Sequence, residues 1–272
     1  MGTYIVGDIH GCFSKWMTLK NLIESQDADA KFILLGDIVD RGSEVKEMLE
    51  WAMSNITEAG KYQMVRGNHE HMKIRWWGKT FKDRPYYLKE DYGFDKFVKK
   101  VGYSRSEIDS IIRFFSSLPI LKELTIKTNE KETRYIITHG GVPRDLVFDD
   151  SEFDISAIDM TSNYIRESFL WERNYHGYGW SSRTVVVHGH TPTGCDELVY
   201  MGAVLGRIDY RRRDINIDVG AVFDDTIPLA AIRLEDLQEF YSCDFDVDDS
   251  KELFELNKRK DLLFDNWEVF NE

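Results

Sequence analysis

Cysteine is scarce in this sequence, which excludes a fold held together by disulfides. The chain of 272 residues has three cysteines, Cys12, Cys195 and Cys243, and none of them forms a Cys-x-x-Cys pair. An odd number of widely spaced cysteines is typical of reduced thiols in a reducing compartment, and it also argues against a zinc ribbon. We therefore expect a cytoplasmic protein.

Long apolar runs are absent as well. No segment approaches the roughly 18 consecutive apolar residues that a membrane-spanning helix needs. The N-terminus, MGTYIVGDIHG, does not follow the basic, apolar and small-residue order of a signal peptide. We expect no membrane partner.

Positive charge is in deficit. The chain has 35 lysines and arginines against 48 aspartates and glutamates, which leaves a formal net charge of −13. Because general nucleic-acid binding depends on a basic face, we do not expect nucleic acid as a partner. The imbalance is strongest at the end of the chain, where residues 244–272 contain ten acidic and four basic side chains.

Three short apolar runs near the start of the chain each stop at glycine and a polar residue. They are TYIVGD (3–8), FILLGD (32–37) and YQMVRGN (62–68), and helix-like segments at 13–27 and 44–56 separate them. This βαβαβ order predicts a parallel sheet with right-handed crossovers.

Further strands are predicted later in the chain. The runs RYIITH (134–139), TVVVHGH (184–190) and INIDVGAVF (215–223) are apolar without alternation, which suggests strands buried on both faces; PLAAIRL (228–234) follows. An irregular segment is expected between the first two of these runs.

We divide the chain into two parts. Residues 1–233 are predicted to form one catalytic domain with a helical insertion or cap at about 71–118, a stretch rich in aromatic and charged residues. Residues 234–272 are predicted to be an acidic C-terminal extension, either a peripheral helix or a tail.

Six residues able to bind a metal ion follow directly on the predicted strands. They are Asp8, His10, Asp37, Asn68, His139 and His190. Ligands gather at the carboxyl ends of strands in sheets of this kind, so we expect these side chains to converge.

Carboxylate, imidazole and amide oxygen without thiolate suit a first-row divalent ion, and among Mn, Fe, Zn, Co and Ni we choose Mn²⁺. A two-metal centre needs one carboxylate between ions about 3.5–4 Å apart, and Asp37 is the best candidate for that bridge. Two such ions lower the pKa of bound water toward about 7, so hydroxide can attack phosphorus directly without a phosphoenzyme. His69 would then protonate the leaving group, and Asp40 would orient His69.

Five short motifs carry a resemblance to a known family. GDIHG (7–11), GDIVDRG (36–42), RGNHE (66–70), HGG (139–141) and GHT (189–191) resemble the metal-dependent phosphoprotein phosphatases of the calcineurin-like metallophosphoesterases, especially the small bacterial and phage type. The resemblance implies an α/β fold, a four-layer αββα sandwich of two mixed β-sheets flanked by helices.

The same resemblance assigns roles to residues. One metal ion would be bound by Asp8, His10 and Asp37, and the other by Asp37, Asn68, His139 and His190. Arg41, in the motif DRG, would bind phosphate oxygens, as would Arg173, which follows a tryptophan in LWERN. Asn68 would also face the phosphate.

The expected activity is hydrolysis of phosphate monoesters by a serine/threonine protein phosphatase, with phosphotyrosine as a further substrate. One alternative is a symmetrical dinucleoside tetraphosphate hydrolase, but those relatives tend to lack the acidic residue of VDRG and to read GNHD, whereas Asp40 and Glu70 are present here. A second alternative is a 2′,3′-cyclic phosphate phosphodiesterase. A third is an inactive binding module, which would have lost a ligand or the acid. The partner is thus a phosphorylated protein or a small phosphoester.

Neighbouring polar residues receive less specific predictions. We expect Arg66 and Glu70 to brace the loop of their motif and His188 to be a buried supporting residue. His71 is expected to be solvated, and the arginines at 211–213 are expected to lie on a solvated hairpin.

Overall fold

The computed structural model describes residues 1–77, 94–128, 132–143, 146, 155–173, 184–244 and 263. The strands are β1 Thr3–Val6, β2 Lys31–Leu34, β3 Tyr62–Met64, β4 Leu121–Lys127, β5 Glu132–Thr138, β6 Thr184–His188, β7 Asp209–Arg211, β8 Asp214–Asn216, β9 Ala230–Arg233 and β10 Gln238–Tyr241. The helices are α1 Phe13–Gln26, α2 Val45–Asn55, α3 Asn68–Trp76, α5 Phe94–Val101, α6 Arg105–Ser117, α7 Asn163–Trp171 and α8 Asp196–Tyr200, with a 3₁₀ turn η3 at Ile155–Ala157.

The first sheet contains the predicted βαβαβ unit. Its strand order is β10-β9-β1-β2-β3. β1, β2 and β3 are parallel, as predicted, β9 is antiparallel to β1, and β10 is antiparallel to β9. Val6 of β1 is in register with Leu34 of β2, and Leu34 is in register with Met64 of β3. The three strands therefore end together, and the loops that follow them share one edge of the sheet.

The second sheet has the strand order β4-β5-β6-β8-β7. Here β5, β6 and β8 run parallel, and β4 and β7 are antiparallel edge strands. Both sheets are mixed, as the family resemblance implied, and the parallel strands at the centre of each fall in the buried apolar runs recognised in the sequence. The run predicted at 215–223 was too long, because β8 overlaps only its first two residues.

The two sheets pack face to face. Because side chains alternate across a strand, Ile5 of β1 and Ile33 of β2 point inward and meet Ile137 of β5 and Val187 of β6 in one buried cluster. This apolar layer holds the ends of both sets of parallel strands at a fixed separation.

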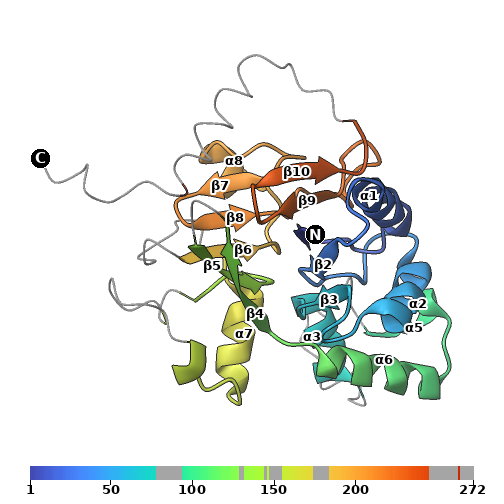
Figure 1. The fold of residues 1–272 in the computed structure, drawn as a ribbon. Helices are drawn as coiled ribbons and strands as arrows, with labels where there is room; N and C mark the ends of the chain where they lie inside the picture. Colours follow the sequence, from blue (N-terminus) through green and yellow to red (C-terminus); the bar gives the residue numbers. More distant parts are fainter. Residues whose placement is uncertain are drawn as a thin grey trace, which may run out of the picture.

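Helices cover the two outer faces. Tyr4 and Phe32 on the outer face of the first sheet pack with Trp16 of α1 and Leu49 of α2. On the second sheet, Ile136 and Val186 pack with Phe169 and Leu170 of α7. Figure 1 shows α1, α2 and α6 on the right, beside the strands of the first sheet, and α7 at the lower left, below β4 and β6. The predicted αββα sandwich is confirmed.

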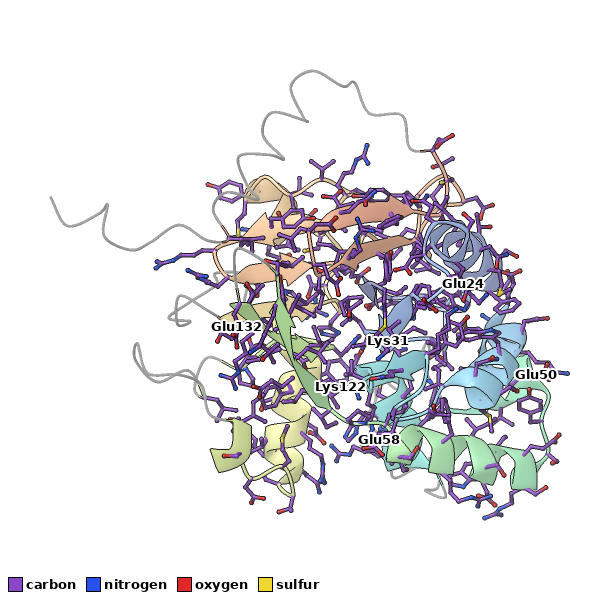
Figure 2. All side chains as sticks on the ribbon, in the orientation of Figure 1. Glu24, Lys31, Glu50, Glu58, Lys122 and Glu132 are labelled. Atoms are coloured by element: carbon purple, nitrogen blue, oxygen red, sulfur yellow. The ribbon has the colours of Figure 1, made fainter. Side chains whose placement is uncertain are left out.

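The helical layer is joined to the first sheet by a polar contact. Glu24, labelled in Figure 2, projects from α1 and pairs with Lys20 and Lys61, with nitrogen–oxygen distances of 2.7 Å in both cases. It also accepts a hydrogen bond from the hydroxyl of Tyr62 on β3. This contact lies at the amino end of β3, away from the carboxyl ends of the strands.

The predicted insertion is helical where the structure describes it. α3, α5 and α6 account for most of its described part, and residues 78–93 lie outside the described residues. Ile108, Ile111 and Phe115 of α6 belong to the same core as α1 and α2. This part of the insertion therefore extends the helical layer.

Three details of the sequence reading were wrong. The irregular segment expected between residues 139 and 184 contains α7. β4 and β7 were not expected as strands. The boundary drawn at residue 233 falls inside the β9–β10 hairpin, because β10 pairs with β9 and completes the first sheet, so residues 238–241 are neither helix nor tail. Most of the predicted extension, residues 245–262 and 264–272, lies outside the described residues.

None of the helices that the structure describes is long and apolar enough to cross a membrane.

Candidate metal centre

The six predicted metal ligands lie at the carboxyl ends of five strands. Asp8 and His10 follow β1, Asp37 follows β2, Asn68 opens α3 after β3, His139 follows β5, and His190 follows β6. All six side chains are buried, with exposed fractions between 0 and 6%. The structure thus brings together residues that are up to 182 positions apart in the chain, as Asp8 and His190 are.

Asp37 is the centre of this arrangement. Its Oδ2 lies 3.5 Å from Nε2 of His10, 3.8 Å from Nε2 of His69 and 3.4 Å from Nε2 of His139. Two groups of potential ligands share it, His10–Asp37–His69 and Asp37–His139–His190, each with ligand atoms within 4.8 Å of one another. This geometry is the one expected for a bridging carboxylate, and the role itself stays a prediction.

Asp8 differs from the other candidates. It belongs to neither group, and its Oδ2 accepts a hydrogen bond from the backbone N–H of His190 at 3.2 Å. Its Oδ1 is buried without a hydrogen-bond partner, as are Nε2 of His190 and Oδ2 of Asp218. Burial raises the pKa of Asp8 well above its usual range, and the nearby Asp218 carboxylate adds to the shift. A cation would satisfy these orphaned atoms.

The histidine rings are oriented by backbone carbonyls. Nδ1 of His10 donates to the carbonyl of Val39 at 2.9 Å, and Nδ1 of His139 donates to that of Leu35 at 2.8 Å. This assignment turns the Nε2 atoms toward Asp37, as in metal sites where a hydrogen bond from the other ring nitrogen sets the orientation of the ligand.

Nε2 of His139 lies close to two oxygen acceptors, to which a neutral ring with its proton on Nδ1 cannot donate. Its Nε2 is 2.9 Å from Oδ1 of Asn68 as well as 3.4 Å from Asp37. Burial alone would lower the pKa of His139, but the Asp37 and Asp8 carboxylates reverse this and raise it to about 10. By contrast, burial lowers the pKa of His10 to about 3. Imidazole nitrogens, carboxylates and an amide oxygen around one bridging group fit a pair of divalent ions.

Five of the predicted site residues have left-handed backbones. The φ angles are 46° at His10, 47° at Asp37, 69° at Asp40, 60° at Arg41 and 69° at His190. Each such residue other than glycine costs on the order of 1 kcal/mol, and strained residues of this kind concentrate at functional sites. The strain is tolerated because the surrounding loops are held by other contacts.

Glu70 holds these loops through three backbone hydrogen bonds. Its carboxylate accepts hydrogen bonds from the backbone N–H groups of Asp37 at 2.8 Å, Ile38 at 3.0 Å and Gly67 at 2.9 Å. The bond to Gly67 caps α3, and the other two bind the loop after β2. Arg66 donates to the carbonyls of Ser116 and Leu118. Both residues brace the motif, as predicted.

His69 and Asp40 form the predicted pair. Nδ1 of His69 lies 2.6 Å from Oδ2 of Asp40, and the His69 backbone N–H donates to Oδ1 of Asp37 at 2.9 Å. A third residue that sequence reasoning missed, Lys73, also donates to Oδ2 of Asp40. Its only signal was its position one helical turn after His69.

The two predicted phosphate-binding arginines border the ligand cluster. Nη1 of Arg41 contacts Nε2 of His10. Nη1 of Arg173 is 3.3 Å from Oγ1 of Thr191, next to His190, and the ring of Trp171 meets His190 edge to face with centroids 5.7 Å apart. Their contact with phosphate stays a prediction.

Other polar residues behave in mixed ways. His188 is buried and pairs with Oδ1 of Asp214 at 2.9 Å, as expected of a supporting residue. The prediction that His71 is solvated was wrong, because α7 packs against α3 and leaves the ring 6% exposed, 3.6 Å from Glu167. The β7–β8 hairpin is present, but Arg213 in it is 3% exposed. Asp218, buried beside Asp8 after β8, was not singled out as a site residue.

This fold and this buried cluster together define a metal-dependent phosphoester hydrolase. The model of the Calcineurin-like phosphoesterase family matches residues 1–220, and the chain belongs to that family. None of the predicted ligands has been lost, so the inactive-module alternative has no support in the sequence.

Known relatives have two kinds of activity in their names. The chain is 25% identical to the asymmetrical bis(5′-nucleosyl)-tetraphosphatase PrpE of Oceanobacillus iheyensis over 256 residues, covering 88% of this chain and 90% of the relative. It is 31% identical to serine/threonine-protein phosphatase 2 of Salmonella typhimurium over 156 residues, covering 57% and 65%. A solved structure described as a putative diadenosine tetraphosphatase matches the fold with a TM-score of 0.52 and 16% identity, covering 88% of this chain and 92% of that one.

Proposed function

We propose that this protein is a serine/threonine phosphoprotein phosphatase that uses two divalent metal ions, with Mn²⁺ as the first choice. The proposed ligands are Asp8, His10 and Asp37 for one ion, and Asp37, Asn68, His139 and His190 for the other. When bound, such a pair offsets phosphate charge and supplies a nucleophile at neutral pH. The shared position of Asp37 in both ligand groups supports this assignment.

Two guanidinium groups are proposed to hold the phosphate. Arg41 and Arg173 enter from different loops, and each contacts a residue at the ligand cluster, His10 and Thr191 respectively. A planar guanidinium binds two phosphate oxygens at once, which orients the phosphorus for in-line attack. Bringing the reacting atoms into line accounts for much of the rate in such sites.

The observation that carries the proposal is the His69–Asp40 pair. The alkoxide of serine or threonine is a poor leaving group and needs a proton as the P–O bond breaks. The bond's electron pair goes to the leaving oxygen, which takes the Nε2 proton of His69. Water adds its hydroxyl group to phosphorus, and its remaining proton restores His69. Oδ2 of Asp40, 2.6 Å from Nδ1, holds the ring for both transfers.

Hydrolysis of a bis(5′-nucleosyl) tetraphosphate is the second candidate. It is supported by PrpE of Oceanobacillus iheyensis, which bears that activity in its name and aligns over most of both chains. A nucleotide phosphate leaves far more readily than an alkoxide, so this reaction depends less on a proton donor. Asp40 and its bond to His69 favour the monoesterase.

A substrate panel tests the proposal. With each of several metal ions, kcat/KM is measured for a phosphoserine peptide, a phosphotyrosine peptide, diadenosine tetraphosphate and a 2′,3′-cyclic nucleotide. We expect the phosphoserine peptide to be the best substrate, and a higher kcat/KM for the dinucleotide would select the second candidate. No hydrolysis of any of them with any metal would reject both.

Variants connect the activity to the site. His69→Asn should lower kcat on the phosphoserine peptide by about 10²- to 10⁴-fold, the usual contribution of a positioned proton donor. His71→Asn, the same change on the same helix, should stay within about threefold of wild type. Equal effects of the two substitutions would contradict the role of His69.

A further inference from the structure

Lys73 is a buried charge beside the proposed proton donor. It is four residues after His69 on α3, so both side chains lie on the same face of that helix. The residue is 1% exposed. A lysine is rarely buried so completely unless its charge is paired, so its contact deserves a functional explanation.

The contact is made to the oxygen that holds His69. Oδ2 of Asp40 accepts a hydrogen bond from Nζ of Lys73 and lies 2.6 Å from Nδ1 of His69. One carboxylate oxygen of Asp40 therefore accepts hydrogen bonds from two donors on a single helix. Lys73 has no acceptor of its own, so it cannot take the place of Asp40 toward His69.

The charge of Lys73 suits this position. Burial would raise the pKa of Asp40, but Lys73 and then His69 hold that pKa well below its usual range. An ionised Asp40 can only accept, which holds one proton on Nδ1 of His69. Nε2, which lies 3.8 Å from Asp37, is then the nitrogen that gains and loses the transferred proton. The loop of Asp40 is also tied from another helix, since Lys100 of α5 donates to the carbonyl of Arg41 at 3.0 Å.

We propose that Lys73 is a positioning residue for the leaving-group proton donor. By donating a hydrogen bond to Oδ2 of Asp40, it sets the orientation and tautomer of His69. This inference rests on the proposed monoesterase function. It predicts that removing Lys73 impairs reactions in proportion to their need for a proton, while substrate binding is retained.

Leaving-group dependence separates this role from a structural one. kcat and KM are measured for phosphate monoesters ranging from p-nitrophenyl phosphate to a phosphoserine peptide. We expect Lys73→Met to lower kcat about tenfold to a hundredfold on the phosphoserine peptide but less than about threefold on p-nitrophenyl phosphate, with KM unchanged. Lys73→Arg, which keeps the charge, should recover part of the loss.

A matched control and a double variant sharpen the test. Lys20→Met also removes a lysine from an ion pair on a helix, with Glu24 at 2.7 Å, and should change neither substrate's kcat. Combining Lys73→Met with Asp40→Asn should cost no more than Asp40→Asn alone, because both act through His69. Additive losses, or equal losses on all leaving groups, would overturn the inference. If Lys73→Met does not fold, Lys73→Gln decides on the same criterion.

A spectroscopic readout keeps the inference distinct from the proposed activity. Two-dimensional ¹H–¹⁵N spectra of the imidazole rings report the tautomer of His69 directly. In its neutral ring, wild type should show the Nδ1–H tautomer, the form that remains after Nε2 has given up its proton, and Lys73→Met should show a mixture of the two neutral tautomers. An unchanged spectrum would refute the role of Lys73 even if the enzyme is active, whereas a changed spectrum in a protein that hydrolyses no monoester would reject only the proposed function.

Discussion

The substitution Glu70→Gln should loosen the metal centre without touching any proposed ligand. The carboxylate of Glu70 accepts three backbone hydrogen bonds, from Asp37, Ile38 and Gly67, in a fully buried position. Glutamine has the same shape but only one acceptor oxygen. It can keep the two bonds made to Oε2, and its amide group then points at the N–H of Ile38.

The expected loss follows from these contacts. A buried N–H left without a partner costs about 1–3 kcal/mol, and the two remaining bonds each lose roughly 1 kcal/mol of charge assistance. Burial and the nearby Asp37 carboxylate raise the pKa of Glu70 to about 6, so removing its charge relieves repulsion and offsets part of this. We expect a net destabilisation of about 2 kcal/mol without metal. The loss should be larger with metal ions, because bound cations already neutralise that repulsion.

Urea unfolding followed by tryptophan fluorescence measures both values, once with a chelator and once with saturating Mn²⁺. Glu58→Gln makes the same chemical change at an exposed position, labelled in Figure 2, and should leave stability within about 0.5 kcal/mol of wild type. A Glu70→Gln protein as stable as this control in both conditions would refute the reasoning.

Three further predictions concern other parts of the molecule. Gly36→Ala should lower stability by about 2 kcal/mol or more in urea unfolding and weaken Mn²⁺ binding in calorimetry. Gly36 has a φ of 96°, and an added Cβ would lie 2.3 Å from the backbone nitrogen of Gly67. A variant that binds Mn²⁺ with wild-type affinity would contradict this prediction. Burial would raise the pKa of Glu24, but hydrogen bonds from Lys20, Lys61 and Tyr62 lower it from 4.5 to about 2. The contribution of Glu24 to stability is therefore present above pH 4.5 and is lost as the pH falls toward 2. Glu24→Gln should therefore cost about 1–2 kcal/mol at pH 7, and urea midpoints should converge with wild type at low pH; a constant difference would exclude the ion pair. Saturating Mn²⁺ at 100 times its Kd should stabilise chelator-treated protein by about 2.7 kcal/mol in thermal unfolding, and Asp37→Asn should abolish the effect; an unchanged Tm would argue against the centre.

The sequence predicted the parallel strands of the first sheet and the buried strands β5 and β6 of the second, because all of these are short apolar runs that stop at glycine or at a polar residue. The same feature located the site, since Asp8, Asp37 and His139 follow those runs directly. β10 could not be foreseen, because QEFY is neither strongly apolar nor strictly alternating, and it is a strand only by pairing with β9. β4, LKELTIK, does alternate in part, so that signal was available.

Side-chain partners were harder to predict than positions. The sequence paired His69 with Asp40 from their places after predicted strands and from the chemistry of the reaction. Nothing in the order of residues showed that Lys73 would bind the same oxygen of Asp40. The burial of His71 depends on α7, which lies about ninety residues away in the chain. Contacts of this kind are set by packing between elements, which local patterns do not encode.

The left-handed backbones around the centre have a consequence for how the protein can evolve. His10, Asp37, Asp40, Arg41 and His190 occupy conformations that glycine adopts freely. Selection for heat resistance alone would therefore favour replacing these residues with glycine, and each gain in stability would remove a side chain of the proposed site. Tolerance of high temperature and turnover should thus trade against each other in laboratory evolution, unless both are screened at every round.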